Sequence, residues 1–140
     1  MQRPSIGSAT GGVGGGPVGP PIAPESSTVF AAALILSCIA PSVHDGDSLR
    51  CQGERVRLVG IDAPEMADSP RCKDGRRARS DCHEGRAVSS RDFLRSLTRG
   101  EVRCTVTGRD AYGRALARCV SDGVDLNRAM LRAGMARRYR

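Results

Sequence analysis

The sequence predicts an α+β domain that is mainly β, with five short strands and two or three helices. Runs such as residues 101–107 alternate apolar and polar side chains, which is typical of strands with one buried face. Turn signals separate these runs, and Asp45-Gly46 is the clearest of them. Two longer stretches, which begin near Glu84 and Asp125, carry apolar residues at helical spacing. The predicted order is three strands, a helix, two strands and a second helix.

The start of the chain divides by composition. Residues 1–27 are mostly glycine, proline and serine, so they cannot bury enough apolar surface to fold and are expected to be disordered. Residues 28–40 form an apolar run that is too short to span a bilayer but long enough for the hydrophobic region of an export signal. We expect this run to overlap the first strand of a domain over residues 36–140. The expected location is the periplasm or the exterior, and the alternative is a membrane tether formed by the apolar run.

Three antiparallel strands are predicted next. The first strand enters the turn at Asp45-Gly46, and the second follows at residues 48–51. A further turn leads into the third strand at residues 55–61, which alternates and then becomes apolar. Residues 68–83 are polar and basic, and they are expected to form a loop.

Two helices are predicted in the second half of the chain. The first covers residues 84–98 and ends before Gly100. The second is capped by the side chain of Asp125 and ends at Gly134. The residues that these helices are expected to place in the core are Phe93, Leu94, Leu97, Leu126 and Met130.

A hairpin lies between the helices, with strands at residues 101–107 and 115–121 and a turn at residues 109–114. Five short strands with a helix after the third fit a Greek-key barrel of the OB-fold type. Closing this barrel would bring the turn at Asp47, the end of the third strand at Asp62 and the hairpin turn towards one face. We therefore expect a functional site on that face.

The charge of the chain favours a polyanionic partner. The formal net charge is +7, and Lys73 is the one lysine among 22 basic residues. Guanidinium groups match phosphate oxygens two at a time, which an ammonium group cannot do. Compositional drift in a GC-rich genome is the alternative explanation of the arginine excess.

Six cysteines in 140 residues favour disulfides and an oxidising compartment. Six thiols allow 15 pairings in principle. Hairpin symmetry favours two of these pairs, since cysteines on opposed strands come close enough to bridge, and the remaining two cysteines would close a short loop. Zinc is the alternative, but the sequence has no CxxC motif, and only His44 and His83 could supplement the thiolates. The favoured pairs are Cys38 with Cys51, Cys104 with Cys119, and Cys72 with Cys82.

Four ordered blocks of the sequence carry a resemblance. The blocks are His44-Asp45-Gly46-Asp47-Ser48, then Arg57-Leu58-Val59-Gly60-Ile61-Asp62-Ala63-Pro64-Glu65, then Asp110-Ala111-Tyr112-Gly113-Arg114, and residues 122–134. Together they resemble the staphylococcal nuclease (thermonuclease) family. The resemblance covers roughly residues 43–139 and implies an OB-fold barrel with helices that acts as a calcium-dependent nuclease on DNA and RNA.

The resemblance also implies a calcium site. Asp47 and Asp62 would provide carboxylate ligands, and Ala63 would provide its backbone carbonyl where the family commonly has threonine. Asp45 would lie behind these ligands. Glu65 would be the general base that activates or orients the attacking water.

The phosphate of the substrate would be bound by Arg57 and Arg114, and Tyr112 would line the nucleotide pocket. Phosphodiester hydrolysis requires these residue types independently of the family. The negative charge of the phosphate must be neutralised, water must be held in line, and a carboxylate must accept its proton. A hard cation held by aspartate oxygens can leave positions open for phosphate and water.

Each of these residues also has a structural interpretation. Asp45-Gly46 is by itself a turn, and Arg57 on the outer face of a strand is usually solvated. The alternative function is therefore a nucleic-acid-binding or interaction module of the same fold without turnover. In either case the expected partner is DNA and/or RNA. The sequence implies no stable protein partner and no transmembrane span, and we expect a monomer.

Overall fold

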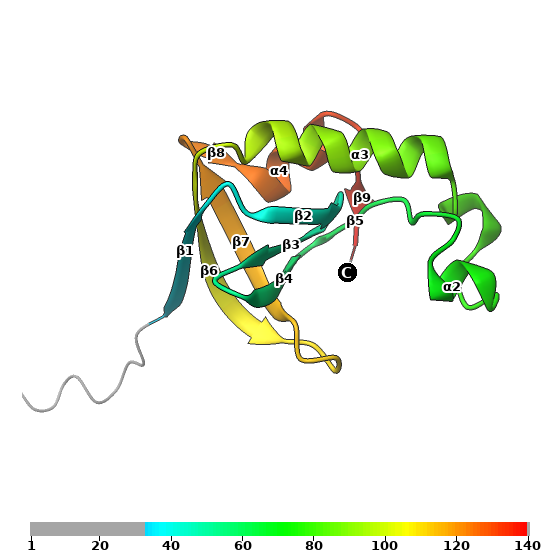
Figure 1. Cartoon of the computed structure of the whole chain (residues 1–140), viewed down its shortest axis with the longest axis horizontal. Helices are drawn as coiled ribbons and strands as arrows, with labels where there is room; N and C mark the ends of the chain where they lie inside the picture. Colours follow the sequence, from blue (N-terminus) through cyan, green and yellow to red (C-terminus); the bar gives the residue numbers. More distant parts are fainter. Residues whose placement is uncertain (1–32, 140) are drawn as a thin grey trace, which may run out of the picture. The chain divides into compact units, whose positions relative to one another are not determined.

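The computed structural model describes residues 33–139. These residues form a curved sheet with helices packed on it (Figure 1). Its strand order is β1-β6-β7-β4-β3-β2, with β4 and β7 parallel and the other pairs in this order antiparallel. The fold is mainly β with an OB-like barrel, as predicted. The main strands are β1 (Leu34–Ile39), β2 (Ser42–Asp45), β3 (Ser48–Cys51), β4 (Glu54–Leu58), β6 (Glu101–Arg109) and β7 (Ala115–Ser121).

The barrel closes through a bend in its first strand. β1 and β2 lie at opposite ends of the strand order, yet only Ala40 and Pro41 separate them in the chain. Ala40 has a φ of 46°, and the ring of Pro41 fixes the φ of the proline itself. The extended chain therefore turns sharply at this point. One bent strand therefore pairs with β6 before the bend and with β3 after it.

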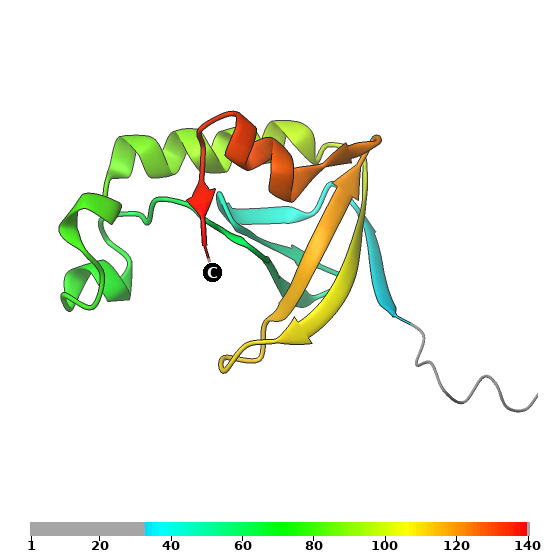
Figure 2. The same cartoon turned by 180° about the vertical axis from the view of Figure 1, so that it is seen from behind.

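Two helices lie on the same side of the sheet in both views (Figures 1 and 2). α3 (Glu84–Leu97) is capped by the ring of His83, which accepts a hydrogen bond from the N–H of Arg86. α4 (Leu126–Arg132) is capped by Asp125 as predicted, and Gly134 follows it with a φ of 71°. No helix within residues 33–139 is long and apolar enough to cross a bilayer.

The core lies between these helices and the sheet. It contains the helix residues predicted for it: Leu94, Leu126 and Met130 are fully buried, and Phe93 and Leu97 pack against them. Asn127 is buried with them, and its amide donates to the carbonyls of Val59 and Ala117. These bonds fix α4 to the end of β4.

Several short elements differ from the prediction. The third strand does not run unbroken to residue 61, because the chain turns at Gly60 with a φ of 84° and resumes as β5 (Ile61–Asp62). β5 pairs with β9 (Arg137–Arg138), which no sequence pattern indicated. The polar loop at residues 68–83 contains the helix α2 (Pro70–Lys73) and the 3₁₀ turn η2 (Arg79–Asp81), and β8 (Val124–Asp125) pairs with β7.

All six cysteines form disulfides, in the three predicted pairs. Cys104 and Cys119 face each other directly across β6 and β7. Cys38 and Cys51 instead join β1 to β3, which are not hydrogen-bonded neighbours, so this bond ties the strand at one end of the sheet to the strand next to the other end. The predicted disorder of residues 1–27 and the start of the apolar run at residues 28–32 lie outside the described residues.

Candidate functional site

Two turns bring the predicted acidic residues together. Asp47 lies in the turn between β2 and β3, and Asp62 ends β5. Only 7% of Asp47 and 6% of Asp62 is exposed. The carboxylate of Asp47 accepts a hydrogen bond from the backbone N–H of Ala63 at 2.8 Å. The two turns are therefore connected directly.

Arg57 lies between the two aspartates. Its Nη1 is 3.0 Å from Oδ2 of Asp47, and its Nη2 is 3.5 Å from Oδ1 of Asp62. The ring of Tyr139 lies 5.6 Å from the guanidinium on another side. The Nη1 atom is buried, and its N–H is not directed well enough at Asp47 for a hydrogen bond. Arg57 therefore interacts with Asp47 and Asp62 mainly through its positive charge and less through directed hydrogen bonds.

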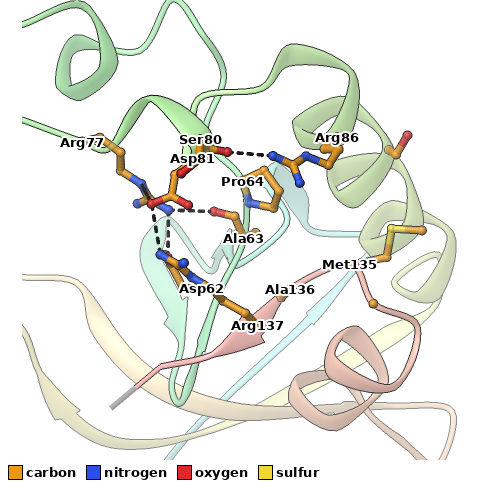
Figure 3. A pocket seen from close by; sticks show the side chains of 12 residues that line it. Asp62, Ala63, Pro64, Arg77, Ser80, Asp81, Arg86, Met135, Ala136 and Arg137 are labelled. Carbon is orange, nitrogen blue, oxygen red and sulfur yellow. Dashed lines mark hydrogen bonds and ion pairs between the residues drawn. The ribbon is translucent and has the colours of Figure 1, made fainter. Parts of the chain in front are cut away.

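Glu65 is held beside the same cluster by residues that the sequence did not indicate. Arg77, from the loop after β5, reaches Oε1 of Glu65 at 3.5 Å and Oδ2 of Asp62 at 2.8 Å. Arg71 lies 3.9 Å from Glu65. Arg137 of β9 contacts Asp62 at 3.2 Å, and Figure 3 shows Arg77 and Arg137 directed at this carboxylate from two sides. The polar residues of this loop show no periodic pattern in the sequence. The predicted Cys72–Cys82 disulfide was the one sequence feature that indicated a restrained loop.

The predicted phosphate-binding residue Arg114 lies in a neighbouring cleft. This cleft has a volume of about 660 Å³, and its lining includes Asp45, Glu65, Tyr112 and Arg114. The guanidinium of Arg114 donates to Asp110 at 2.7 Å and lies 5.7 Å from the ring of Tyr112. Arg114 thus shares a cleft with Glu65 but contacts neither Arg57 nor the two buried aspartates within residues 33–139.

The buried carboxylate of Asp47 has less compensating positive charge than Asp62, since Arg57 is its one ion-pair partner within residues 33–139. Burial raises the pKa of Asp47 well above its usual value, the nearby Asp45 raises it further, and Arg57 offsets only part of this. Asp45 accepts hydrogen bonds from the hydroxyl of Ser48 at 2.6 Å and from the N–H of Asp47 at 3.2 Å, which hold its carboxylate beside Asp47. A buried carboxylate beside a second one favours the binding of a cation.

The oxygen atoms available suit a hard cation such as calcium. Two aspartate carboxylates and the carbonyl of Ala63 are the ligand types that Ca²⁺ takes in proteins. No three His, Cys, Asp or Glu side chains within residues 33–139 form a metal-binding group by themselves, so the carbonyl would be the third protein ligand. Asp62 and the Ala63 carbonyl are bonded to Arg77 in this structure, at 2.8 and 3.1 Å.

The sequence from Arg55 onward matches a family model. The model is described as "Staphylococcal nuclease homologue", and it matches residues 55–140, which is more than half of the chain. The chain belongs to the staphylococcal nuclease family. The match includes Arg57, Asp62, Glu65 and Arg114 but not Asp47, so the place of Asp47 in the site depends on its contacts alone.

Relatives in this family carry different names. The "Succinoglycan biosynthesis protein ExoI" of Rhizobium meliloti (strain 1021) is 42% identical over 96 residues, which is 68% of this chain and 48% of the relative. An "Uncharacterized endonuclease" of Escherichia coli O157:H7 is 36% identical over 100 residues, which is 67% of this chain and 55% of the relative. The chain thus spans about half the length of the curated relatives it matches.

Proposed function

We propose that this chain is a calcium-dependent nuclease that hydrolyses phosphodiester bonds of DNA and/or RNA with little sequence specificity. The observation that carries the proposal is the contact of Arg57 with both Asp47 and Asp62, beside a cleft that contains Glu65 and Arg114. Membership of the staphylococcal nuclease family and the printed name of the E. coli relative support it.

The residues of the cleft suit the charges of the reaction. Glu65 is the proposed general base, because its carboxylate lines the cleft and its side chain is 17% exposed, so water can reach it. Arg57 and Arg114 are proposed to stabilise the charge that accumulates on the phosphate in the transition state. Tyr112 is 69% exposed and offers its ring to a nucleotide at the edge of the cleft.

Asp47, Asp62 and the carbonyl of Ala63 would hold the calcium ion, and Asp45 would support Asp47 from behind. Calcium would supply positive charge to neutralise the phosphate. The role of the chain is to keep these oxygens buried and close together, which the hydrogen bond from Ala63 to Asp47 achieves.

The alternative is a nucleic-acid-binding module without turnover, and one observation favours it. Arg77 bonds the same oxygens of Asp62 and Ala63 that a calcium ion would need. If Arg77 never leaves, the site is a salt-bridge network, and the basic cleft would only bind phosphates.

The release of acid-soluble nucleotides from DNA and from RNA separates the two functions. The full chain with intact disulfides is expected to release nucleotides with Ca²⁺ present and to stop when a chelator is added. Tight binding to both nucleic acids with no release under any divalent cation would establish the binding module instead.

The location of the protein follows from its disulfides. Three disulfides within residues 33–139 indicate an oxidising environment outside the cytoplasm. We propose export to the periplasm or the exterior, where a nuclease of low specificity does not meet the genome of its own cell. Mass analysis of the mature N-terminus would test this, since a processed chain that keeps β1 and Cys38 begins before Leu34.

A further inference from the structure

We propose that Arg77 is an internal cation, which occupies oxygens of the calcium site when the metal is absent and must leave when calcium binds. The inference rests on the calcium site proposed above. It adds a regulatory residue from the disulfide-closed loop, Cys72 to Cys82, which is not part of that site.

The contacts of Arg77 coincide with the proposed metal ligands. Its Nη2 donates to Oδ2 of Asp62 at 2.8 Å and to the carbonyl of Ala63 at 3.1 Å (Figure 3). Its Nη1 lies 3.5 Å from Glu65, the proposed base. Only 9% of the side chain is exposed, so it is part of the site and not of the surface.

Arg77 and calcium cannot share these oxygens. Calcium bonds its oxygen ligands at about 2.3–2.6 Å, and it needs the lone pairs that now accept the Arg77 hydrogen bonds. Oδ2 of Asp62 already accepts from Arg77 at 2.8 Å and from Arg137 at 3.2 Å, so a third cation on this oxygen would be repelled strongly in a buried site. Metal binding therefore requires the guanidinium to move.

The structure offers Arg77 a second position. Its Nε is buried without a hydrogen-bond partner within residues 33–139, and it lies 3.7 Å from Oδ2 of Asp81. An unsatisfied buried N–H weakens the present position. A movement towards Asp81, whose Oδ2 also accepts a hydrogen bond from Arg137, would satisfy this N–H and would release Asp62, the Ala63 carbonyl and Glu65 together.

The movement would couple metal binding to the base. While Arg77 holds Glu65 at 3.5 Å, the carboxylate is neutralised by a neighbouring cation. Once Arg77 has moved, Arg71 at 3.9 Å is the remaining ion-pair partner of Glu65 within residues 33–139, and Oε1 of Glu65 can accept a hydrogen bond from water in the cleft. Arg77 would thus keep Glu65 from acting as the base until calcium binds.

The test measures calcium affinity by titration calorimetry for the full chain and for Arg77→Gln. The expected result is that Arg77→Gln binds Ca²⁺ at least about fivefold more tightly than the unchanged chain, because no internal cation must be displaced. Arg79→Gln is the matched control. Arg79 lies in the same loop, is exposed, and forms no ion pair in the described part of the chain, so its substitution should change the affinity less than twofold.

Thermal unfolding provides a second readout. Without calcium, Arg77→Gln is expected to melt below the unchanged chain, since Asp62 and Glu65 lose a partner. Saturating Ca²⁺ should raise its melting temperature by more than it raises that of the unchanged chain. Arg77→Lys keeps the charge but loses the forked hydrogen-bond donation. Its calcium affinity should lie between those of the unchanged chain and Arg77→Gln, and it replaces Arg77→Gln in the test if that variant fails to fold.

Two outcomes would overturn the inference. One is a folded Arg77→Gln or Arg77→Lys whose calcium affinity is unchanged or weaker, which would make Arg77 a support for the ligands. The other is no calcium binding by any variant. Nuclease assays on the same samples keep this separate from the proposed function: tighter calcium binding without hydrolysis supports the inference and refutes the nuclease, and hydrolysis with an unchanged affinity does the reverse.

Discussion

Asp47 accepts a hydrogen bond from the backbone of Ala63 at 2.8 Å, although the two residues are sixteen positions apart in the chain. This bond sets the spacing between the turn after β2 and the segment after β5. It is also nearly inaccessible to solvent, because both residues are buried. The acidic site therefore depends on how closely this turn can approach its surroundings.

Gly46 permits that approach. It lies beside Asp47 without a positive φ, so backbone freedom does not explain it. A Cβ placed there would overlap the Ser90 hydroxyl of α3 and would lie 2.8 Å from Cβ of Ala63. Gly46→Ala should lower the free energy of unfolding by about 1–3 kcal/mol in urea denaturation. Gly100→Ala, where nothing lies within 4 Å of the added carbon, should change stability far less; equal losses in the two variants would refute the packing explanation.

Arg114→Ala should lower the proposed nuclease turnover by about 100-fold or more, because its proposed role is to stabilise the charge on the phosphate. Its ion pair with Asp110 is partly exposed, so the change in unfolding free energy should stay within about 1 kcal/mol. Arg109→Ala is the control, as Arg109 belongs to the same hairpin but pairs with Glu54 outside the cleft. An Arg114→Ala variant that unfolds would show that the arginine is structural.

Glu65→Gln should slow hydrolysis by about 100-fold or more while calcium binding largely persists. The amide keeps the size of the side chain but cannot accept the proton of water at neutral pH. Single-turnover assays give the rate, and calorimetry on the same sample gives the affinity. Full activity in this variant would exclude Glu65 as the base.

The turn that carries Arg114 should loosen at low pH. Partial burial acts to raise the pKa of Asp110, but hydrogen bonds from Arg114 and Tyr112 outweigh it and hold the pKa below its usual value. The ionised form therefore stabilises the turn above the pKa of an unfolded aspartate, about 3.9, and this contribution is lost as the pH falls through the lower folded value. Amide chemical shifts of Tyr112 and Arg114 in an NMR titration should report the loss, and Asp110→Asn should abolish that transition.

The disulfide between Cys104 and Cys119 should contribute about 3 kcal/mol to stability, since it closes a loop of 15 residues. Both cysteines are fully buried, so alanine is the appropriate replacement. Urea denaturation of the Cys104→Ala and Cys119→Ala double variant measures the change. A loss well below 1 kcal/mol would mean that the strand pairing alone holds β6 and β7.

Much of this arrangement could be predicted from the sequence where local patterns specify it. Strands that return through tight turns must lie side by side, and this placed Asp47 near Asp62. The capping residue Asp125 and the glycine at 134 bounded α4 for similarly local reasons. Two of the disulfide pairs followed from hairpin symmetry, although Cys38 reaches Cys51 only because of the bend at Pro41.

The residues that sequence patterns missed are those whose position depends on distant contacts. Arg77 lies in a polar loop with no periodicity, and only its burial in the folded chain distinguishes it from the exposed Arg79. Arg137 belongs to a two-residue strand, too short for a pattern, and it reaches Asp62 only through pairing with β5. Gly46 was interpreted as a turn residue, because a sequence does not reveal which helix will pack on it.

The pairing of β9 with β5 has a consequence for biosynthesis. Asp62 is translated early, but its partner Arg137 leaves the ribosome 75 residues later. Tyr139, whose ring lies beside Arg57, follows Arg137. Until then the acidic cluster lacks part of its wall. The proposed site can therefore assemble only after the segment that carries Arg137 and Tyr139 has left the ribosome.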